Sequence, residues 1–254
     1  MQPYRAGQQQ YAAQVVEDVR ISWRDAHVAI ELPEKARIWS SAVFNGGEMN
    51  GSCIVNHMVG RFFDSKDPAE YMRESCLAWG YDPANTVGLI TAAKLSHLSL
   101  QERHGDEFDL LCATTAGTTN AARAGVPRAV FSSYMTIEED GRNGNEAAAM
   151  SQKPGTINTV IVLEAQLTDA AVWNLLMVAA EAKAAALADL HIQDPETGLV
   201  ATGTTTDTVV IAVLNRGTYH RKHLYGGTAT TIGSSVGQLV YETVYESVQT
   251  QKEK

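Results

Sequence analysis

Asp207 and Lys183 are the two charged residues of this 254-residue chain whose surroundings point to chemistry. Asp207 closes the stretch TGTTTD, directly before a strongly apolar segment that is typical of a strand. Partial burial there would suit its carboxylate to work as a general base. The competing interpretation is an Asx turn, in which the carboxylate only accepts hydrogen bonds from nearby backbone N–H groups.

Lys183 falls on the apolar side of a predicted helix. The apolar positions of that helix recur at helical spacing and form a stripe, and Lys183 lies within this stripe. Its other members are Val172, Leu176, Ala179, Ala186 and Leu190. A lysine in such a stripe needs a carboxylate partner or a cavity. Glu181 is two residues away and cannot face it, whereas Asp207 is a possible partner. A Lys–Asp pair could move protons or stabilise an oxyanion; the alternative is a lysine that snorkels at the edge of the stripe.

His57 is the third candidate for chemistry. It follows Ile54 and Val55 in the stretch IVNH and could act as an acid, a base or a ligand, although a structural histidine has the same pattern. No HxH, HExxH or HxxxH pair with acidic support occurs, so no metal site is predicted. Ser41 lacks a GxSxG elbow and Cys112 lies in an apolar strand, so we favour an activated water as the nucleophile.

Five stretches of small polar residues adjoin apolar segments. They are SSAVFNGG (40–47), TTAGTTNA (114–121), GTINT (155–159), TGTTTD (202–207) and GGTATTIG (226–233). Such residues bring backbone N–H groups and polar side chains close to a ligand, although each stretch alone is also ordinary turn chemistry. Together they favour one pocket, whose predicted ligand-binding residues are Asn45, Gly46, Asn56, Thr115, Asn120, Asn158, Thr202, Thr204, Thr206 and Thr228.

Strands in runs, with three helices scattered among them, must position these residues. Alternating or continuous apolar patterns predict a hairpin over 14–32 and further strands at 37–44, 86–93, 108–113, 156–165 and 209–214. Helices are predicted over 67–80, from Thr168 to about 190, and at the end of the chain, where Val236, Val240, Val244 and Val248 repeat on one face. We expect an α+β fold, with a single domain over 13–250, a mixed sheet packed by about three main helices, and a flexible tail over 1–12.

Composition excludes several partners. The formal net charge is −9, with 20 basic and 29 acidic residues, which argues against binding to nucleic acid or to an anionic membrane. Three isolated cysteines and no signal-like segment predict a cytoplasmic protein. The apolar stretch 170–190 is interrupted by polar residues, so it predicts a buried or amphipathic helix instead of a membrane span.

The five stretches also carry a family resemblance. SSAVFNGG followed by IVNH, then TAGTTNA, GTINT before the long helix, TGTTTD and YGGTATTIG resemble the adenosylcobinamide amidohydrolase family, in its order, over residues 36–250. Two departures are visible. Thr205 stands where the family pattern TGTGTD has glycine, and Thr118 and Thr119 stand where TAGLSNA has Leu and Ser.

The resemblance implies a reaction and a substrate. The amide that joins a propionate side chain of the corrin ring to aminopropanol would be hydrolysed, which converts adenosylcobinamide into adenosylcobyric acid. The asparagines would grip the ring's carboxamides, because selecting one amide among many requires that the ring be placed. The expected partner is a small cobalt-containing corrinoid, with no required cofactor and a possible homodimer. The alternatives are a non-catalytic corrinoid-binding module and, more remotely, a phosphate-handling enzyme that lacks GxxxxGK[ST].

Overall fold

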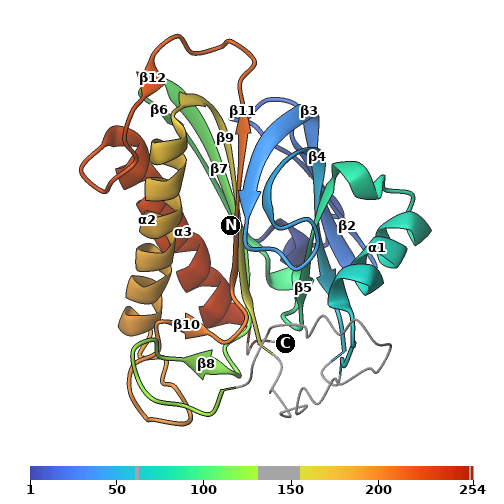
Figure 1. The fold of residues 1–254 in the computed structure, drawn as a ribbon, viewed down its shortest axis with the longest axis vertical. Helices are drawn as coiled ribbons and strands as arrows, with labels where there is room; N and C mark the ends of the chain where they lie inside the picture. The colour runs from blue at the N-terminus through green and yellow to red at the C-terminus, as the bar shows by residue number, and fades with distance from the viewer. Residues whose placement is uncertain (61–62, 131–154, 252, 254) are drawn as a thin grey trace, which may run out of the picture.

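A curled mixed β-sheet separates two long helices from a shorter third one (Figure 1). The computed structural model describes residues 1–60, 63–130, 155–251 and 253. Helices α2 (Asp169–Asp189) and α3 (Thr231–Thr250) cover one face of the sheet, and α1 (Pro68–Ala78) lies on the other side. The predicted α+β class, with a mixed sheet and three main helices, is therefore confirmed over the described residues.

Ten strands form the main sheet, in the order β1-β2-β3-β11-β9-β7-β6, with β4 on β3, β5 on β4 and β12 on β9. The pairs β9–β11, β9–β12 and β4–β5 are parallel and the others are antiparallel. Two further strands, β8 and β10, form a separate ladder. The bounds are β1 Gln10–Ala12, β2 Arg20–Arg24, β3 His27–Ser40, β4 Gly47–Met58, β5 Thr86–Thr91, β6 Ser99–Gly105, β7 Phe108–Ala116, β8 Ala121–Ala122, β9 Ile157–Leu167, β10 Gly203–Thr204, β11 Thr208–Leu214 and β12 Lys222–His223.

The long strand β3 makes the sheet curl. Its first half pairs with β2 and its last residues, Arg37 to Ser40, pair with β11, while β4 follows the other edge. The register with β4 shifts between Glu31 and Ala36, a segment that contains Pro33 and so cannot keep a regular ladder. The two halves of the sheet therefore close over an interior core that includes Ile54 and Val160.

Strands β7 and β9 are buried on both faces. On β7, Leu111 and Ala113 point into the interior core, whereas Leu110 and Cys112 point toward α2 and α3. Burial on both sides explains why these strands appear in the sequence as continuous apolar runs.

The two long helices begin at threonine caps. The Thr168 hydroxyl accepts from the Ala171 N–H at 3.1 Å, and the Thr230 hydroxyl accepts from the Gly233 N–H at 3.0 Å. The predicted valine face of α3 (Val236, Val240, Val244, Val248) packs against the sheet, which confirms that prediction. Among the described helices, α2 alone is long and apolar enough to cross a membrane by length and composition.

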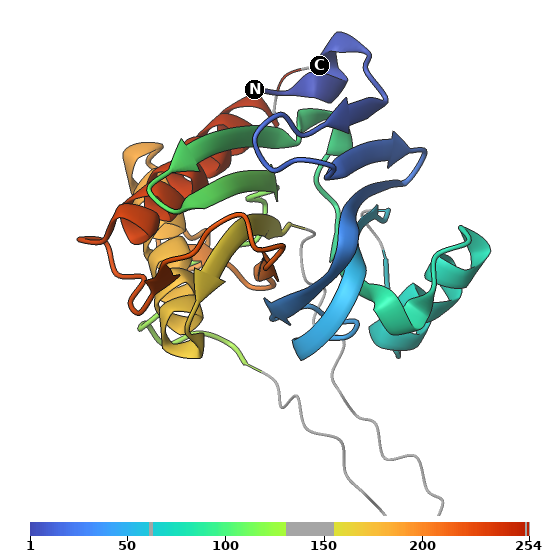
Figure 2. The same cartoon turned by 90° about the horizontal axis from the view of Figure 1, so that it is seen from above.

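The polar N-terminal segment, expected as a flexible tail over 1–12, makes defined contacts. It forms a 3-10 turn, η1 (Pro3–Ala6), and strand β1, and Tyr4 is buried. The Arg5 guanidinium lies 2.6 Å from the Glu253 carboxylate, so the two ends of the chain meet (Figure 2). Two other 3-10 turns, η2 (Pro83–Asn85) and η3 (Leu95–His97), precede β5 and β6. Most of the predicted irregular connection over 123–154 falls outside the described residues.

Candidate functional site

Three of the five polar stretches meet at one edge of the sheet. Strand β7 ends there beside the start of β9, because Ala116 pairs with Ile157. The parallel strand β11 starts at the same edge, and the short ladder of β8 and β10 places Gly203 opposite Ala122. The stretches 114–121, 155–159 and 202–207 are therefore brought together from distant parts of the sequence, as the prediction of a shared pocket requires.

Asp207 is the most highly coordinated side chain at this edge. Its Oδ2 atom accepts from the Thr204 N–H at 2.9 Å, and its Oδ1 atom accepts from the Ile157 N–H at 3.1 Å. The Thr204 hydroxyl donates to Oδ1 and the Lys183 ammonium donates to Oδ2. Two backbone donors, one hydroxyl and one cation thus fix both carboxylate oxygens.

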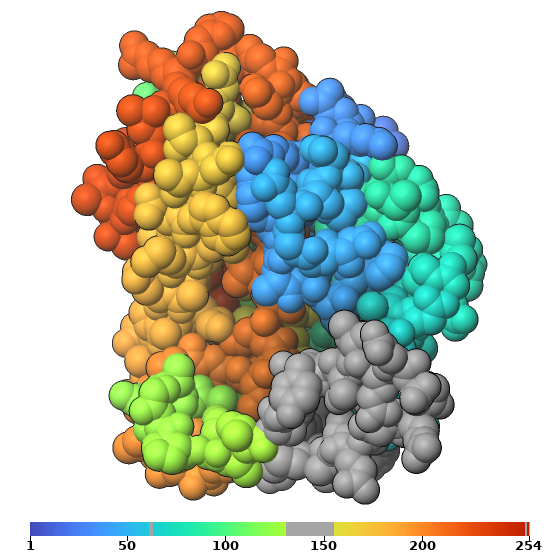
Figure 3. All heavy atoms as spheres, in the orientation of Figure 1, coloured from blue at the N-terminus to red at the C-terminus, as the bar shows by residue number. Residues whose placement is uncertain are grey.

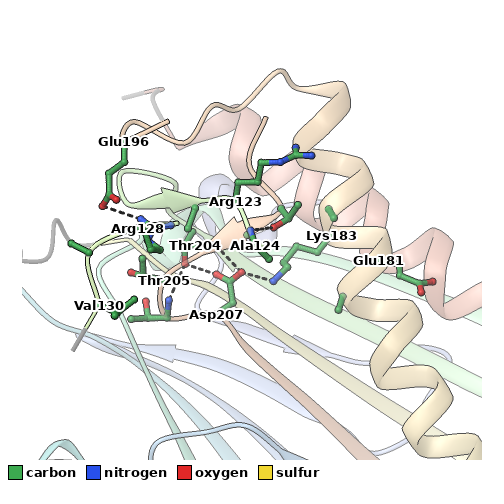
Figure 4. A pocket seen from close by; sticks show the side chains of 17 residues that line it. Arg123, Ala124, Arg128, Val130, Glu181, Lys183, Glu196, Thr204, Thr205 and Asp207 are labelled. Atoms are coloured by element: carbon green, nitrogen blue, oxygen red, sulfur yellow. Dashed lines mark hydrogen bonds and ion pairs between the residues drawn. The ribbon is translucent and has the colours of Figure 1, made fainter. Parts of the chain in front are cut away.

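Lys183 reaches Asp207 from the stripe of α2. The two side chains are 13% and 11% exposed, so the ion pair is largely removed from water while its tips still reach the pocket (Figure 4). Asp207, which the sequence suggested as a possible partner of Lys183, is the residue with which it pairs. Gly203 packs directly on the pair: a Cβ atom there would lie 2.4 Å from Asp207 Oδ2 and 2.9 Å from Lys183 Nζ. A residue with a side chain at position 203 would therefore displace the pair.

A pocket of about 790 Å³ opens above the pair. Figure 3 shows that the segments around residues 120–130 and 200 pack beneath the end of α2. The predicted residues that line this pocket are Lys183, Thr202, Thr204, Thr206 and Asp207, and α2 adds the small side chains of Ala180 and Ala184. The pocket therefore has both polar groups and small apolar groups in its lining.

Threonine hydroxyls and one asparagine stabilise the loops around the pair. The Thr206 hydroxyl lies 2.6 Å from the Thr156 hydroxyl, and the Asn120 amide donates to the Thr205 hydroxyl at 2.7 Å. The Thr202 hydroxyl accepts from the Ala124 N–H at 2.9 Å. Thr205, which replaces the glycine of the family pattern, thus supplies the acceptor that holds Asn120.

Two arginines at the rim were not predicted. Arg123 and Arg128 line the pocket, and Arg128 pairs with Glu196 at 3.0 Å and with the buried Asp194 at 3.5 Å. Burial by itself would raise the pKa of Asp194, but hydrogen bonds from the Arg123 and Glu196 N–H groups and the charge of Arg128 together hold it below its usual range. Arg123 and Arg128 come after the polar stretch 114–121, and no local pattern in the sequence indicates that they line a pocket. Gly203, also not predicted, could have been found from its place inside TGTTTD.

Asn45, Gly46 and Thr228 lie away from the pocket lining. The Asn45 side chain donates to the carbonyl oxygens of Pro83 and Thr86, at 2.8 and 2.7 Å, and so braces the turn between β3 and β4. Gly46 is required by packing, because a Cβ atom would lie 2.3 Å from the Ala42 oxygen. Thr228 belongs to the loop before α3, which packs against the first half of α2, two to three turns before Lys183.

Asn56, Thr115 and Asn158 are buried inside the curled sheet. Their side chains are 6%, 0% and 1% exposed and bind one another instead of lining the pocket. The structure therefore places these three predicted ligand-binding residues in the core. These residues were predicted to contact a ligand because they are polar and lie near strand ends. Their side chains instead point to the interior face of the sheet.

His57 also lies away from the pocket, in an aromatic cluster under α1. Its Nε2 atom is 2.8 Å from the Tyr71 hydroxyl, its Nδ1 atom is 3.0 Å from the Ala26 oxygen, and its ring packs on Trp79. Burial lowers the pKa of His57, and the pKa of the neighbouring His27 falls to about 4. This environment is that of a structural histidine, the alternative weighed from the sequence.

Nucleophilic cysteine chemistry finds no support at the site. Cys112 is buried in β7, and burial raises the pKa of its thiol to about 12. Over residues 1–60, 63–130, 155–251 and 253, no three His, Cys, Asp or Glu side chains are grouped to hold a metal ion.

The fold and site define an α+β protein in which a carboxylate–ammonium pair, ringed by hydroxyl and backbone donors, faces a small-molecule pocket. Over residues 12–254 the chain matches the family model described as adenosylcobinamide amidohydrolase. It is 30% identical over 224 residues to an adenosylcobinamide amidohydrolase of Halobacterium salinarum, covering 86% of this chain and 83% of that protein. It is 26% identical over 210 residues to the Methanosarcina mazei protein of the same name, covering 80% and 86%.

The chain belongs to the adenosylcobinamide amidohydrolase family. It is accordingly a hydrolase of the amidohydrolase type, and the family resemblance seen in the sequence is confirmed. A solved protein of Pyrococcus horikoshii matches at a TM-score of 0.41 with 12% identity, covering 88% of this chain and 76% of that one.

Proposed function

We propose that the protein hydrolyses the amide between the corrin ring's propionate side chain and aminopropanol, and so converts adenosylcobinamide into adenosylcobyric acid. Two relatives that cover most of the chain carry the name adenosylcobinamide amidohydrolase. The observation that carries the proposal is the Lys183–Asp207 pair at the end of the pocket, since amide hydrolysis needs a group that activates water and a group that stabilises negative charge.

The proposed reaction uses the two members of the pair in different roles. Asp207 takes one proton from a water molecule whose oxygen bonds to the amide carbon. The Lys183 ammonium, close to the same carboxylate, stabilises the negative charge that develops on the carbonyl oxygen. The C–N bond then breaks as Asp207 gives this proton to the nitrogen, and aminopropanol leaves. The new carboxylic acid on the corrinoid gives its proton to the released amine, which leaves a carboxylate and an ammonium ion.

The fixed geometry of Asp207 supports this assignment. Its four hydrogen-bond donors hold the carboxylate in one orientation, and the Thr204 hydroxyl is the donor that can rotate away to free a lone pair of Oδ1 for the proton from water. Thr202 lies beside it in the pocket, and its hydroxyl can donate to a polar group of the substrate, whereas the Thr204 and Thr206 hydroxyls already donate to Asp207 Oδ1 and to the Gly155 oxygen. Ala180 and Ala184 leave room beside the helix for the arm that carries the scissile amide.

The proposal is tested by incubating the purified protein with adenosylcobinamide and separating the corrinoids by chromatography. We expect a new corrinoid with the mass of adenosylcobyric acid and one equivalent of free aminopropanol. A corrinoid that stays bound but chemically unchanged would overturn the proposal in favour of a binding module.

We also propose that the protein acts in the cytoplasm, as a homodimer, on a small corrinoid. The free cysteines Cys53, Cys76 and Cys112 are all buried thiols, which suits a reducing compartment. Exposed apolar side chains on α2, among them Trp173 and Met177, offer a surface that a second copy could cover. Sedimentation velocity at micromolar concentration tests the dimer: a single monomeric species would exclude it.

A further inference from the structure

Three amide and hydroxyl side chains form a buried chain across the interior core. The Asn56 side chain donates to the Thr115 hydroxyl at 2.8 Å, and the Asn158 side chain donates to Asn56 Oδ1 at 2.9 Å and to the Ile90 oxygen at 3.1 Å. These contacts join β4 and β5 on one side of the core to β7 and β9 on the other. We call the side chains of Asn56, Thr115 and Asn158 the amide bridge.

The amide bridge lies where the sequence otherwise uses apolar side chains. Two residues along each strand, on the same face, stand Ile54, Ala113 and Val160, all part of the interior core. Within the described part of the chain, the Asn158 Oδ1 atom has no hydrogen-bond partner. Buried polar groups with incomplete hydrogen bonding lower stability, so stability alone does not explain these residues.

The bridge connects directly to the groups that hold Asp207. Ile157, whose N–H donates to Asp207 Oδ1 at 3.1 Å, is the residue before Asn158. Asn158 itself pairs with Thr208, the residue after Asp207, on the neighbouring parallel strand. On the other side of Asn158, Thr115 is its direct partner on β7. Any shift of Asn158 therefore moves a donor to Asp207 and the start of β11 together.

The amide bridge also contacts strands β4 and β5, which are not hydrogen-bonded to β9 within the sheet. In the ladder, β5 pairs with β4 and β4 with β3, so β5 reaches β9 through β4, β3 and β11. The bond from Asn158 to the Ile90 oxygen crosses the core and closes this path. A polar bridge with defined geometry fixes the relative position of the two walls, which apolar packing alone does less uniquely.

We propose that Asn56, Thr115 and Asn158 are positioning residues for Asp207 instead of residues that touch the substrate. The inference rests on the proposed role of Asp207 in hydrolysis. The bridge sets the placement of the Ile157 N–H and of Thr208, and through them the orientation of the carboxylate. Its loss lowers the rate of the chemical step and leaves substrate binding intact.

Neighbouring threonines on β7 provide a matched test. Thr115 and Thr114 are both completely buried hydroxyls, but Thr114 faces α3 and lies 2.9 Å from the Thr243 hydroxyl. Thr115→Val removes the acceptor for Asn56, whereas Thr114→Val removes a hydroxyl from the opposite face. We expect Thr115→Val to lower kcat about tenfold or more with KM changed less than twofold, Thr115→Ser to restore most of the rate, and Thr114→Val to keep the wild-type kcat.

A variant with an apolar bridge separates positioning from folding. Asn56→Leu, Thr115→Val and Asn158→Leu together replace every member of the bridge by a side chain of similar size, which can be nearly neutral for stability. We expect a folded protein with an unchanged Kd for the corrinoid and a reduced kcat. A wild-type kcat in this protein, or in Thr115→Val if the triple variant does not fold, would overturn the inference.

A double variant distinguishes this inference from the proposed function. If the bridge acts through Asp207, adding Thr115→Val to Asp207→Asn lowers the residual rate no further. If the double variant instead loses rate by the product of the two single effects, the amide bridge does not act through Asp207. Absence of turnover in the wild-type protein would instead show that the proposed function is wrong.

Discussion

Lys183 and Asp207 form an ion pair although they are 24 positions apart in the sequence and lie on two different segments of the fold. Helix α2 delivers the ammonium and the turn before β11 delivers the carboxylate, and both side chains are nearly buried. A pair that is largely out of water, and whose carboxylate accepts four hydrogen bonds, holds its geometry, because breaking it would leave a charge without a partner. Activity is therefore expected to depend on how Lys183 and Asp207 are placed.

Removal of the ammonium is expected to damage both activity and stability. In Lys183→Met the Asp207 carboxylate stays in place without its cation. Turnover should therefore fall roughly 10²-fold, and the free energy of unfolding should fall by about 2 kcal/mol. Steady-state kinetics and urea unfolding measure the two effects, and Lys183→Arg, which keeps the charge, should be the less destabilised variant. A lysine that merely snorkels would give an active and stable Lys183→Met protein.

Gly203 should be intolerant of a single methyl group. In Gly203→Ala the new Cβ atom would approach the Asp207 oxygen and the Lys183 nitrogen, and displacement of the pair by about 1 Å can cost about 100-fold in rate. Gly227→Ala is the control, because a Cβ atom at that position has no neighbour within 4 Å. Equal kcat values for the two variants would show that the placement of the pair does not limit the reaction.

Acid should destabilise the cluster under α1. Burial, the neighbouring His57 and Arg24 lower the pKa of folded His27 from 6.5 to about 4. The unfolded chain therefore binds more protons between these values, and stability is retained above pH 6.5 and lost as the pH falls toward 4, by up to about 1.4 kcal/mol per pH unit.

Urea unfolding at pH 7.5 and pH 5 tests this dependence. His27→Gln should lose less stability between the two pH values than the wild-type protein does, because one titrating group is gone. His220→Gln, at an exposed position, should behave like the wild type. An unchanged pH dependence in His27→Gln would assign the acid sensitivity to other groups.

Local patterns in the sequence predicted the helices and the charged pair well. The cap at Thr168 and the stripe that contains Lys183 depend on residues within a few turns, so α2 and its buried lysine could be inferred. Strands β4 and β6 were not predicted as strands. Both carry many polar residues, and β6 has β7 as its one neighbour in the sheet, so little apolar pattern marks either strand.

Apart from the Lys183–Asp207 pair, the site was predicted only where its residues lie close together in the sequence. Thr204 and Asp207 share one turn, so their proximity follows from the sequence. The burial of Asn158 depends on which face of β9 meets β4 and β5 across the core, and that pairing is set by the curl of β3. Polar residues at strand ends cannot be divided into pocket and core until the tertiary arrangement is known.

The most direct test of the central claim is single-turnover cleavage of adenosylcobinamide by Asp207→Asn with the enzyme in excess. The substitution keeps the shape of the side chain and removes the base, so we expect cleavage to slow by roughly 10²–10⁴-fold while titration of the corrinoid absorbance gives the wild-type Kd. Asp106→Asn, in the exposed turn between β6 and β7, should cleave at the wild-type rate. Cleavage by Asp207→Asn at a rate close to that of the wild type would contradict the account.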